Sequence, residues 1–241
     1  MSLARNDCMT CKVRNCSILK NCDSQTLTNI SSYKLSGSIK KGERLFSEGD
    51  PVKGIYFIKK GFLKIELNGK VGRPLILSFV GKGTILGHRT NIAHAIHPSS
   101  ATAASEVHYC YIPGHIFSEI LCNSSILKQQ ILNQLLVDLK LTEKKALNLA
   151  HKSVREKIAE ALLQIALVYG YEEKKQSFQI NFCRQDIADL AGTTKEQVSK
   201  VLKELESEKL VKFTAKKFNY INIDALSAIS LGNLSSPSTE K

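Results

Sequence analysis

Short apolar runs separated by turn residues fill the chain between positions 26 and 115. The clearest of these runs cover residues 54–59, 61–67 and 74–80. Runs of this length, rich in β-branched and aromatic residues, predict strands, and Lys-Lys-Gly at 59–61 and Leu-Asn-Gly-Lys at 67–70 are typical of hairpin turns. Many short strands at close spacing favour a β-roll or barrel over a parallel α/β sheet.

The pattern becomes helical near position 122. Residues 124–149 contain no Gly or Pro and are rich in Leu, Lys and Gln. Apolar side chains recur there at helical spacing, which predicts one helix of more than twenty residues. A long, half-exposed helix with an apolar stripe usually packs on a partner. We therefore expect a two-fold contact between copies of this helix, made by Leu132, Leu135, Leu139 and Leu147.

Residues 153–230 have the pattern of a compact second domain. Helical spacing covers 154–169, 185–190 and 195–209, and two short β-type runs follow at 210–213 and 218–223. Gly192 suits a left-handed turn position, and Thr194 is a good N-cap for the helix that follows. The sequence therefore predicts a helix-turn-helix followed by a basic hairpin, which together form a winged helix-turn-helix.

The helix that follows Thr194 has two distinct faces. The predicted buried stripe consists of Val198, Val201, Leu202 and Leu205. The outer face carries Lys195, Glu196, Ser199, Lys200 and Lys203. Short polar and charged groups on the N-terminal half of such a helix can reach base edges in the major groove. We therefore expect a recognition helix for double-stranded DNA.

Composition and charge narrow the class of protein. Lys and Arg number 34 against 22 Asp and Glu, a formal net charge of +12, and 43% of the residues are hydrophobic. This basic excess fits a polyanionic partner, and the apolar fraction is that of a globular chain. Without an apolar leader or a run of eighteen apolar residues, we expect a cytoplasmic protein with no membrane partner. The histidines follow no known catalytic pattern, so no enzyme is predicted.

The chain resembles the CRP/FNR family of bacterial transcription regulators over nearly its whole length. The resemblance rests on residues 41–50 and 54–65 in the β region and on residues 184–188 and 196–200 in the DNA-binding region. It implies an α+β fold with an N-terminal cyclic-nucleotide-binding-like β-roll, a long dimerisation helix and a C-terminal winged helix-turn-helix. It also implies a homodimer that reads a palindromic DNA site and contacts RNA polymerase.

The ligand-binding stretch departs from the cyclic-nucleotide branch of that family. That branch holds the ribose with an acidic residue and the phosphate with an Arg-Ser or Arg-Thr pair. Here His88 stands at the acidic position and Ser99 at the arginine position. Without that arginine a buried phosphate loses its charge-assisted hydrogen bonds. Cyclic-nucleotide sensing is therefore not expected, although Arg89 could substitute and bind another small anionic ligand.

The cysteines resemble those of the FNR-like branch, which holds an oxygen-labile iron–sulfur cluster. Four of the seven cysteines, Cys8, Cys11, Cys16 and Cys22, lie within fifteen residues, and Cys110 precedes an Ile-Pro step as in that branch. Thiolates suit a [4Fe–4S] cluster. The expected ligands are Cys11, Cys16, Cys22 and Cys110. Such a cluster would sense oxygen, nitric oxide or redox state.

The cysteine spacing leaves alternatives open. The order here is C-x2-C-x4-C-x5-C, whereas the family places its C-x2-C step directly before C-x5-C. Cys8 is therefore an alternative to Cys11, which we favour because its loop to Cys16 is shorter. The four N-terminal cysteines could also form the whole set, and zinc or a thiol switch could replace the cluster. Cys122 and Cys183 are interpreted as packing residues.

Several residues are expected to contact DNA: Arg184, Gln185, Thr194, Lys195, Glu196, Ser199, Lys200, Lys212, Lys216 and Lys217. The family pattern E-x-x-S-R ends here in Lys200, which cannot grip guanine with a planar fork. The lysines of the hairpin are expected on phosphates. A rival hypothesis is a zinc or thiol redox protein whose winged domain serves only for protein interaction.

The expected organisation has five parts. They are a cysteine-rich segment (1–25), a β-roll sensor domain (26–122), a dimerisation helix (123–151), a winged helix-turn-helix domain (152–231) and a disordered tail (232–241).

Overall fold

A computed structural model describes residues 7–69, 74–89, 96–169, 183–214 and 217–232. The chain forms two compact units, one of Met1–Leu67 with Val80–Thr142 and one of Asn68–Phe79 with Glu143–Lys241. The boundaries between the units fall at residues 67/68, 79/80 and 142/143, the last of them inside one long helix. Apart from Gly232, the predicted disordered tail lies outside the described residues.

The N-terminal segment consists of two 3-10 turns and one helix, η1 (Arg14–Cys16), η2 (Ile18–Asn21) and α1 (Ser24–Tyr33). Asp23 caps α1, because its carboxylate accepts from the backbone N–H of Thr26 at 2.8 Å. Hydrogen bonds from the backbone N–H and the hydroxyl of Thr26 lower the pKa of Asp23. Leu27 and Ile30 bury one face of α1 against the first unit's core, so the cysteine-bearing turns are attached to a packed helix.

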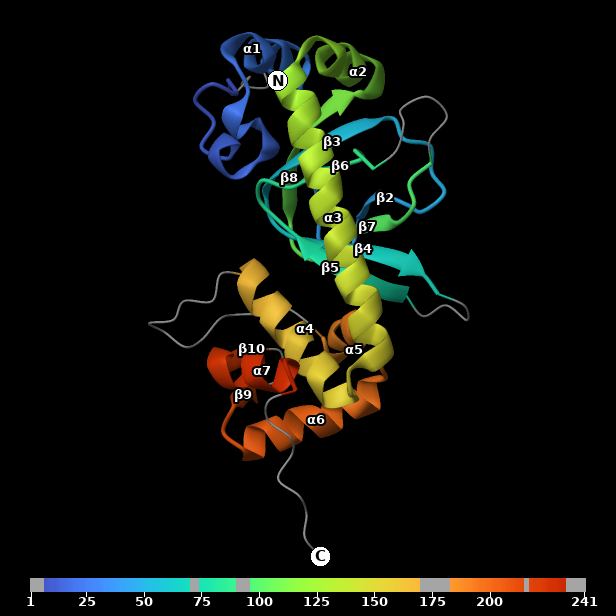
Figure 1. Ribbon diagram of the computed structural model, residues 1–241, viewed down its shortest axis with the longest axis vertical. Coiled ribbons are helices and arrows are strands. Elements are labelled where there is room, and N and C mark those ends of the chain that lie inside the picture. Colours follow the sequence, from blue (N-terminus) through green and yellow to red (C-terminus); the bar gives the residue numbers. More distant parts are fainter. Residues whose placement is uncertain (1–6, 70–73, 90–95, 170–182, 215–216, 233–241) are drawn as a thin grey trace, which may run out of the picture. The chain divides into compact units, whose positions relative to one another are not determined.

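The first unit is built on antiparallel strands (Figure 1). One sheet has the order β1-β8-β3-β6, made of Leu35–Ile39, Val107–Pro113, Gly54–Lys60 and Ile85–Leu86. The other sheet has the order β2-β7-β4-β5, made of Arg44–Phe46, Ser100–Ala103, Leu63–Asn68 and Pro74–Val80, and nearly all of β5 is counted with the second unit. In the first sheet Ile55 pairs with Ile112 and Phe57 with Cys110. These side chains belong to one apolar cluster that also contains residues of α1 and of α2 (Gly114–Asn123).

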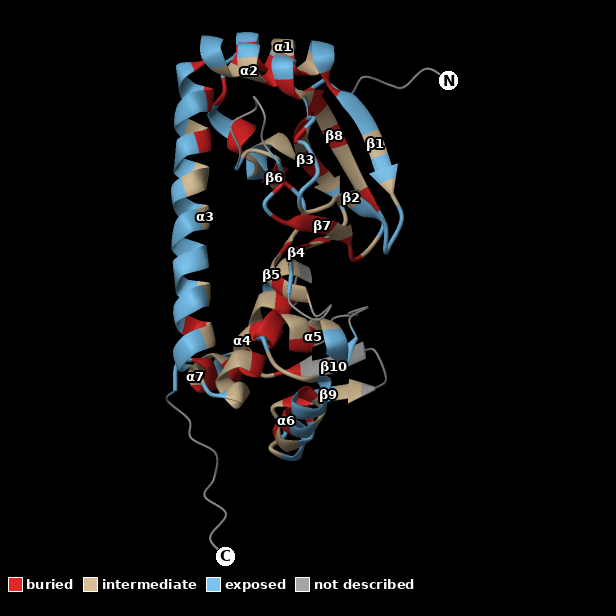
Figure 2. Ribbon diagram, turned by 90° about the vertical axis from the view of Figure 1, so that its right-hand side faces the viewer, coloured by how far each residue is buried: buried red, intermediate tan, exposed pale blue. Residues whose placement is uncertain are grey.

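Helix α3 (Ser125–His151) is one continuous helix with one face partly buried. Leu127 and Ile131 are buried in the apolar cluster of the first unit, and Leu135 packs against that cluster. In Figure 2 most of the helix is exposed. Leu132, Leu136, Leu139 and Leu147 are each between 56% and 60% exposed. Of the four leucines expected in the two-fold contact, Leu135 differs from the other three because it is only partly exposed and packs against the core of its own unit.

The second unit contains the winged helix-turn-helix. Its elements are α4 (Val154–Tyr169), α5 (Arg184–Ala191), α6 (Lys195–Ser207), β9 (Val211–Thr214), β10 (Lys217–Ile221) and α7 (Ile223–Ser230). Ile158, Leu162, Leu202 and Leu226 are fully buried in it. Gly192 has the predicted left-handed conformation, with φ 61° and ψ 43°. The predicted fold class is confirmed by this architecture.

The predicted strand 218–223 extends two residues too far at its C-terminal end. Strand β10 ends at Ile221, and α7 begins two residues later. The Asn222 side chain accepts from the backbone N–H of Ala225 at 2.9 Å and so caps a helix that the sequence did not predict. Among the described residues, no helix is long and apolar enough to cross a membrane.

Candidate DNA-binding surface and cysteine site

Helix α6 has the two faces that its sequence predicts. Thr194 caps it by accepting from the backbone N–H of Gln197, and the stripe Val198, Val201, Leu202 and Leu205 is buried. One open surface hollow is lined by Lys195, Glu196, Ser199, Lys200, Lys203 and Glu204. Within the helix, Ser199 Oγ donates to the Lys195 carbonyl at 2.9 Å. The outer face therefore presents polar and charged groups that can meet a DNA groove.

The other predicted DNA contacts lie at the start of α5 and on the hairpin. The Arg184 guanidinium lies 5.5 Å from the centre of the Phe213 ring on β9. Gln185 is exposed and donates to Asp189 at 2.7 Å, and Lys212 is exposed on β9. Lys217 begins β10, and Lys216 lies outside the described residues. Arg184 thus links α5 to the hairpin within the second unit.

The interpretation of Cys122 and Cys183 as packing residues was wrong. Both thiols are exposed. Cys183 lies just before α5, where its backbone N–H donates to the Asp186 carboxylate at 3.1 Å. Because the end of a helix lies at the surface, a residue there need not be buried even when it is apolar.

Three cysteines from two distant parts of the sequence line one small pocket of the first unit. They are Cys8 and Cys11 from the N-terminal segment and Cys110 from the centre of β8. Two lysines, Lys34 and Lys59, line the same pocket, together with Arg14. The Lys34 ammonium is buried and donates to Cys8 Sγ at 3.0 Å. Burial raises the pKa of the Cys110 thiol, while the charges of Lys34 and Lys59 act to lower it.

Neither Cys16 nor Cys22 lines this pocket. Cys16 is exposed and adjoins Gly83, which lines the pocket, since a Cβ on Gly83 would come within 3.0 Å of Cys16 Sγ. Cys22 is buried in the same apolar cluster as Cys8 and Cys110. Burial, together with the neighbouring Asp23 charge, raises the pKa of Cys22 to about 11.

The thiols are ligands of the kind that an iron–sulfur group needs, and the side chains around them also suit such a group. The soft sulfur donors that such a group needs are present on one pocket and next to it, and cations face them. In the described part of the chain, however, no three Cys, His, Asp or Glu side chains already form a metal-binding group. Cluster binding would therefore require the thiols to move closer together.

The stretch where a cyclic nucleotide would be anchored is occupied by internal polar contacts. Arg89 Nε and His88 Nε2 approach the same carboxylate oxygen of Asp138, on α3, at 2.9 and 3.0 Å. Burial acts to raise the pKa of Asp138, but hydrogen bonds from His88 and Gln134 and the charge of Arg89 outweigh it and lower that pKa to about 2. The hydroxyl of Ser100 accepts from the backbone N–H of Glu48 at 3.0 Å. Arg89 is thus already paired with a carboxylate.

Comparisons with known proteins agree with this architecture. The family model described as Cyclic nucleotide-binding domain matches residues 37–124, and the model described as Crp-like helix-turn-helix domain matches residues 156–229. The "Anaerobic regulatory protein" of Pasteurella multocida is 26% identical over 92% of this chain and 81% of its own length. The "Fumarate and nitrate reduction regulatory protein" of Salmonella typhimurium is 26% identical over 90% of this chain and 89% of its own.

Solved structures share the fold. FixK2 from Bradyrhizobium japonicum aligns with a TM-score of 0.72 at 20% identity, covering 81% of this chain and 96% of its own. A sensor-type β-roll followed by a Crp-like helix-turn-helix defines a DNA-binding transcription regulator rather than an enzyme. The chain belongs to the CRP/FNR family of DNA-binding transcription regulators.

Proposed function

We propose that this regulator works as a homodimer and senses oxygen, nitric oxide or redox state through an iron–sulfur cluster, of the [4Fe–4S] type, bound in its first unit. The observation that carries the proposal is the shared pocket of Cys8, Cys11 and Cys110, which joins the N-terminal segment to β8. The names of the relatives, which refer to anaerobic regulation and to fumarate and nitrate reduction, support the same signal class.

The proposed ligands are Cys11, Cys16, Cys22 and Cys110, with Cys8 as the alternative to Cys11. When bound, the cluster would supply the iron and sulfide with which oxygen or nitric oxide reacts. The chain's own cations offset the negative charge of four thiolates, and Lys34 already donates to a thiol. Leu19, Ile30 and Phe57 line the same pocket and exclude water from it.

The route from the thiols to the dimer helix is a continuous apolar cluster. Cys8, Cys22 and Cys110 belong to it, and so do Phe117 of α2 and Leu127 and Ile131 of α3. A bound iron–sulfur group would hold the thiols of the N-terminal segment and β8 together. The apolar side chains around them would then pack more tightly and hold α3 in one position. A coupling free energy between the thiol site and the dimer contact follows from that shared packing.

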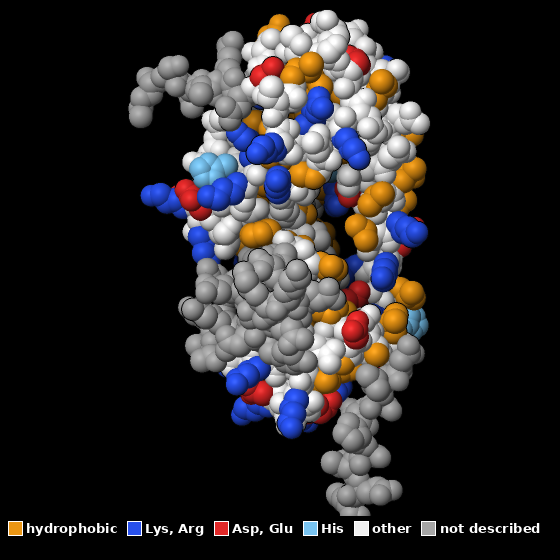
Figure 3. Space-filling view, turned by 90° about the vertical axis from the view of Figure 1, so that its left-hand side faces the viewer, with side chains coloured by type: hydrophobic (Ala, Val, Ile, Leu, Met, Phe, Trp, Pro, Cys, Tyr) orange, Lys and Arg blue, Asp and Glu red, His pale blue; other side chains and the backbone are white. Residues whose placement is uncertain are grey.

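The proposed output is binding of a palindromic DNA site. The exposed leucines of α3 would pair two copies, and hydrophobic side chains follow the edge of the space-filling view where α3 lies (Figure 3). Pairing would set two α6 helices about one DNA turn apart. We further propose that Glu196, Ser199 and Lys200 read bases, that Lys212, Lys216 and Lys217 contact phosphates, and that the bound dimer contacts RNA polymerase.

Anaerobic purification with an iron, sulfide and zinc assay tests the sensor. We expect brown protein with roughly four irons per chain, as for one cubane cluster. We also expect that air exposure removes the colour and lowers DNA affinity. Colourless protein with stoichiometric zinc would contradict the proposal and favour a structural metal site. A small anionic ligand in the β-roll is the less favoured alternative, because Arg89 is paired with Asp138.

A further inference from the structure

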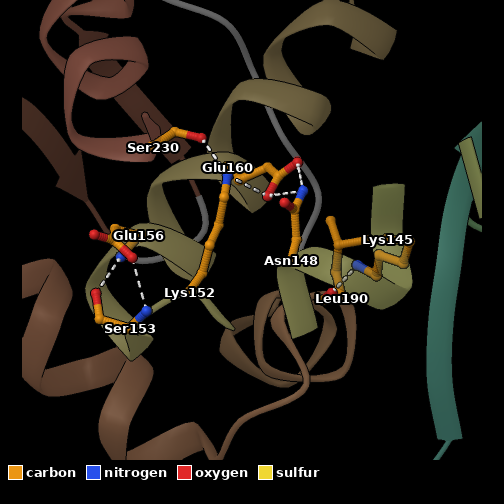
Figure 4. Close-up of polar contacts among 8 residues, drawn as sticks. All are labelled: Lys145, Asn148, Lys152, Ser153, Glu156, Glu160, Leu190 and Ser230. Atoms are coloured by element: carbon orange, nitrogen blue, oxygen red, sulfur yellow. Dashed lines mark hydrogen bonds and ion pairs between the residues drawn. The ribbon is translucent and has the colours of Figure 1, made fainter. Parts of the chain in front are cut away.

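The last turns of α3 make two contacts with the helix-turn-helix in the second unit. Lys145 Nζ donates to the backbone carbonyl of Leu190, near the end of α5 (Figure 4). Leu149 lies against Gly192, in the turn between α5 and α6, since a Cβ on Gly192 would come within 2.7 Å of Leu149 Cδ2. The first contact therefore reaches the end of α5, and the second reaches the turn that joins α5 to the recognition helix α6.

A polar network fastens the same helical face to α4 and α7. Asn148 is buried and donates to both carboxylate oxygens of Glu160, at 2.7 and 2.8 Å. Lys152 bridges Glu160 at 2.9 Å and the hydroxyl of Ser230 at 3.0 Å. Figure 4 shows Lys145, Asn148 and Lys152 reaching toward the other elements of the second unit. Residues 145, 148 and 149 share one face of α3 by their spacing, and Lys152 follows directly after the helix ends, so this end of α3 is held at several points.

Lys145 is placed where a cation stabilises α5. The final carbonyls of a helix lack intrahelical partners, and the negative end of the helix dipole favours a positive charge. Burial lowers the pKa of Lys145 to about 8, against the opposing influence of Glu160. A desolvated ammonium needs a hydrogen-bond acceptor, and the carbonyl of Leu190 is one. The contact is therefore a specific one between α3 and the end of α5.

We propose that Lys145 and Leu149 are positioning residues for DNA binding, which fix the orientation of the helix-turn-helix on the end of α3. In a dimer paired through α3, this orientation sets the separation of the two recognition helices. The inference rests on the dimeric part of the proposed function and does not depend on the identity of the sensor group.

The test compares two duplexes in DNA-binding titrations. One is the palindrome that the unchanged protein selects from random-sequence DNA, and the other is the same duplex with one half-site scrambled. Duplexes with one or two base pairs added between half-sites measure the tolerance of spacing. The variants are Lys145→Met, which removes the donor, and Leu149→Ala, which removes the contact with Gly192. The matched control is Lys144→Met, which removes an exposed charge one residue away.

We expect Lys145→Met to weaken binding to the palindrome about tenfold, as for loss of one hydrogen bond to a charged group. It should leave binding to the half-site duplex within about twofold and flatten the dependence on spacing, because orientation and not base contact is lost. Leu149→Ala should act in the same direction, and Lys144→Met should match the unchanged protein.

Equal losses on both duplexes would overturn the proposal, because they indicate damage to the helix-turn-helix itself. Unchanged spacing dependence in both variants would overturn it too. Sedimentation of each variant separates this failure from failure of the dimer proposal, since a monomeric unchanged protein would refute the latter. If Lys145→Met does not fold, Leu149→Ala decides the question by the same criteria.

Discussion

The cysteine pocket and the recognition helix are built in opposite ways. The residues of α6 that face outward come from one helix of thirteen residues, and a local period of 3.6 places them. The cysteine pocket joins Cys8 and Cys11 to Cys110, about a hundred positions along the chain. A surface on one regular element survives changes elsewhere in the fold, whereas a pocket made from distant segments depends on how those segments pack.

The largest effect is expected from removing Cys110, the pocket thiol that comes from the β-roll. We expect Cys110→Ala to abolish iron binding after anaerobic reconstitution, because three N-terminal thiols cannot complete the proposed set. Cys122→Ala, which removes an exposed thiol, is the control and should retain about four irons. Full iron content in Cys110→Ala would instead favour an all-N-terminal ligand set.

The exposed leucines of α3 lie between the cysteines of the pocket and the recognition helix along the chain, and are the proposed dimer contact. We expect Leu139→Glu to give a monomer in sedimentation and to weaken binding to the palindrome by at least about a hundredfold, because two half-site contacts become one. Lys140→Glu introduces the same side chain at an exposed polar neighbour and should remain dimeric. A dimer that persists in Leu139→Glu would place the interface on another surface.

The buried cation of the cysteine pocket offers a finer test of the sensor. The reduced cluster carries one more negative charge than the oxidised one, so loss of a nearby cation disfavours reduction. We expect Lys34→Met to lower the midpoint potential by about 60 mV, a tenfold change for one electron. Lys60→Met, at an exposed position on β3, should leave the potential unchanged. Equal midpoint potentials in the unchanged protein, Lys34→Met and Lys60→Met would show that Lys34 does not lie close to the cluster.

Base readout by α6 is expected to show the smallest effect. Lys200 cannot present the planar fork that grips guanine O6 and N7. We expect Lys200→Arg to sharpen discrimination at one guanine of each half-site by about 1 kcal/mol or more, within the range of a bidentate pair. Binding-site selection with both proteins measures this difference.

The wing lysines provide the comparison for that measurement. Lys212→Ala should weaken binding to all sequences alike and reduce the salt slope by about 1, as for one phosphate contact. No gain at the guanine in Lys200→Arg, or a sequence-specific loss in Lys212→Ala, would mean that α6 docks in another register.

Local features of the DNA-binding unit were predictable from sequence. The left-handed Gly192, the cap at Thr194 and the buried stripe of α6 all follow from short-range backbone and side-chain preferences. Prediction failed where a local signal was weak. Helix α7 is only eight residues long, and its cap at Asn222 immediately follows a strand.

The sequence by itself determined the class of fold, the order of its elements and the residue types available for DNA and for a metal group. Turn residues, hydrophobic periods and caps act over a few positions, so they can be recognised in one chain. Only the tertiary structure decided that Leu135 faces the core, that Lys34 donates to Cys8 and that Lys145 reaches the end of α5. Those contacts join residues on different elements, and packing rather than sequence spacing brings them together.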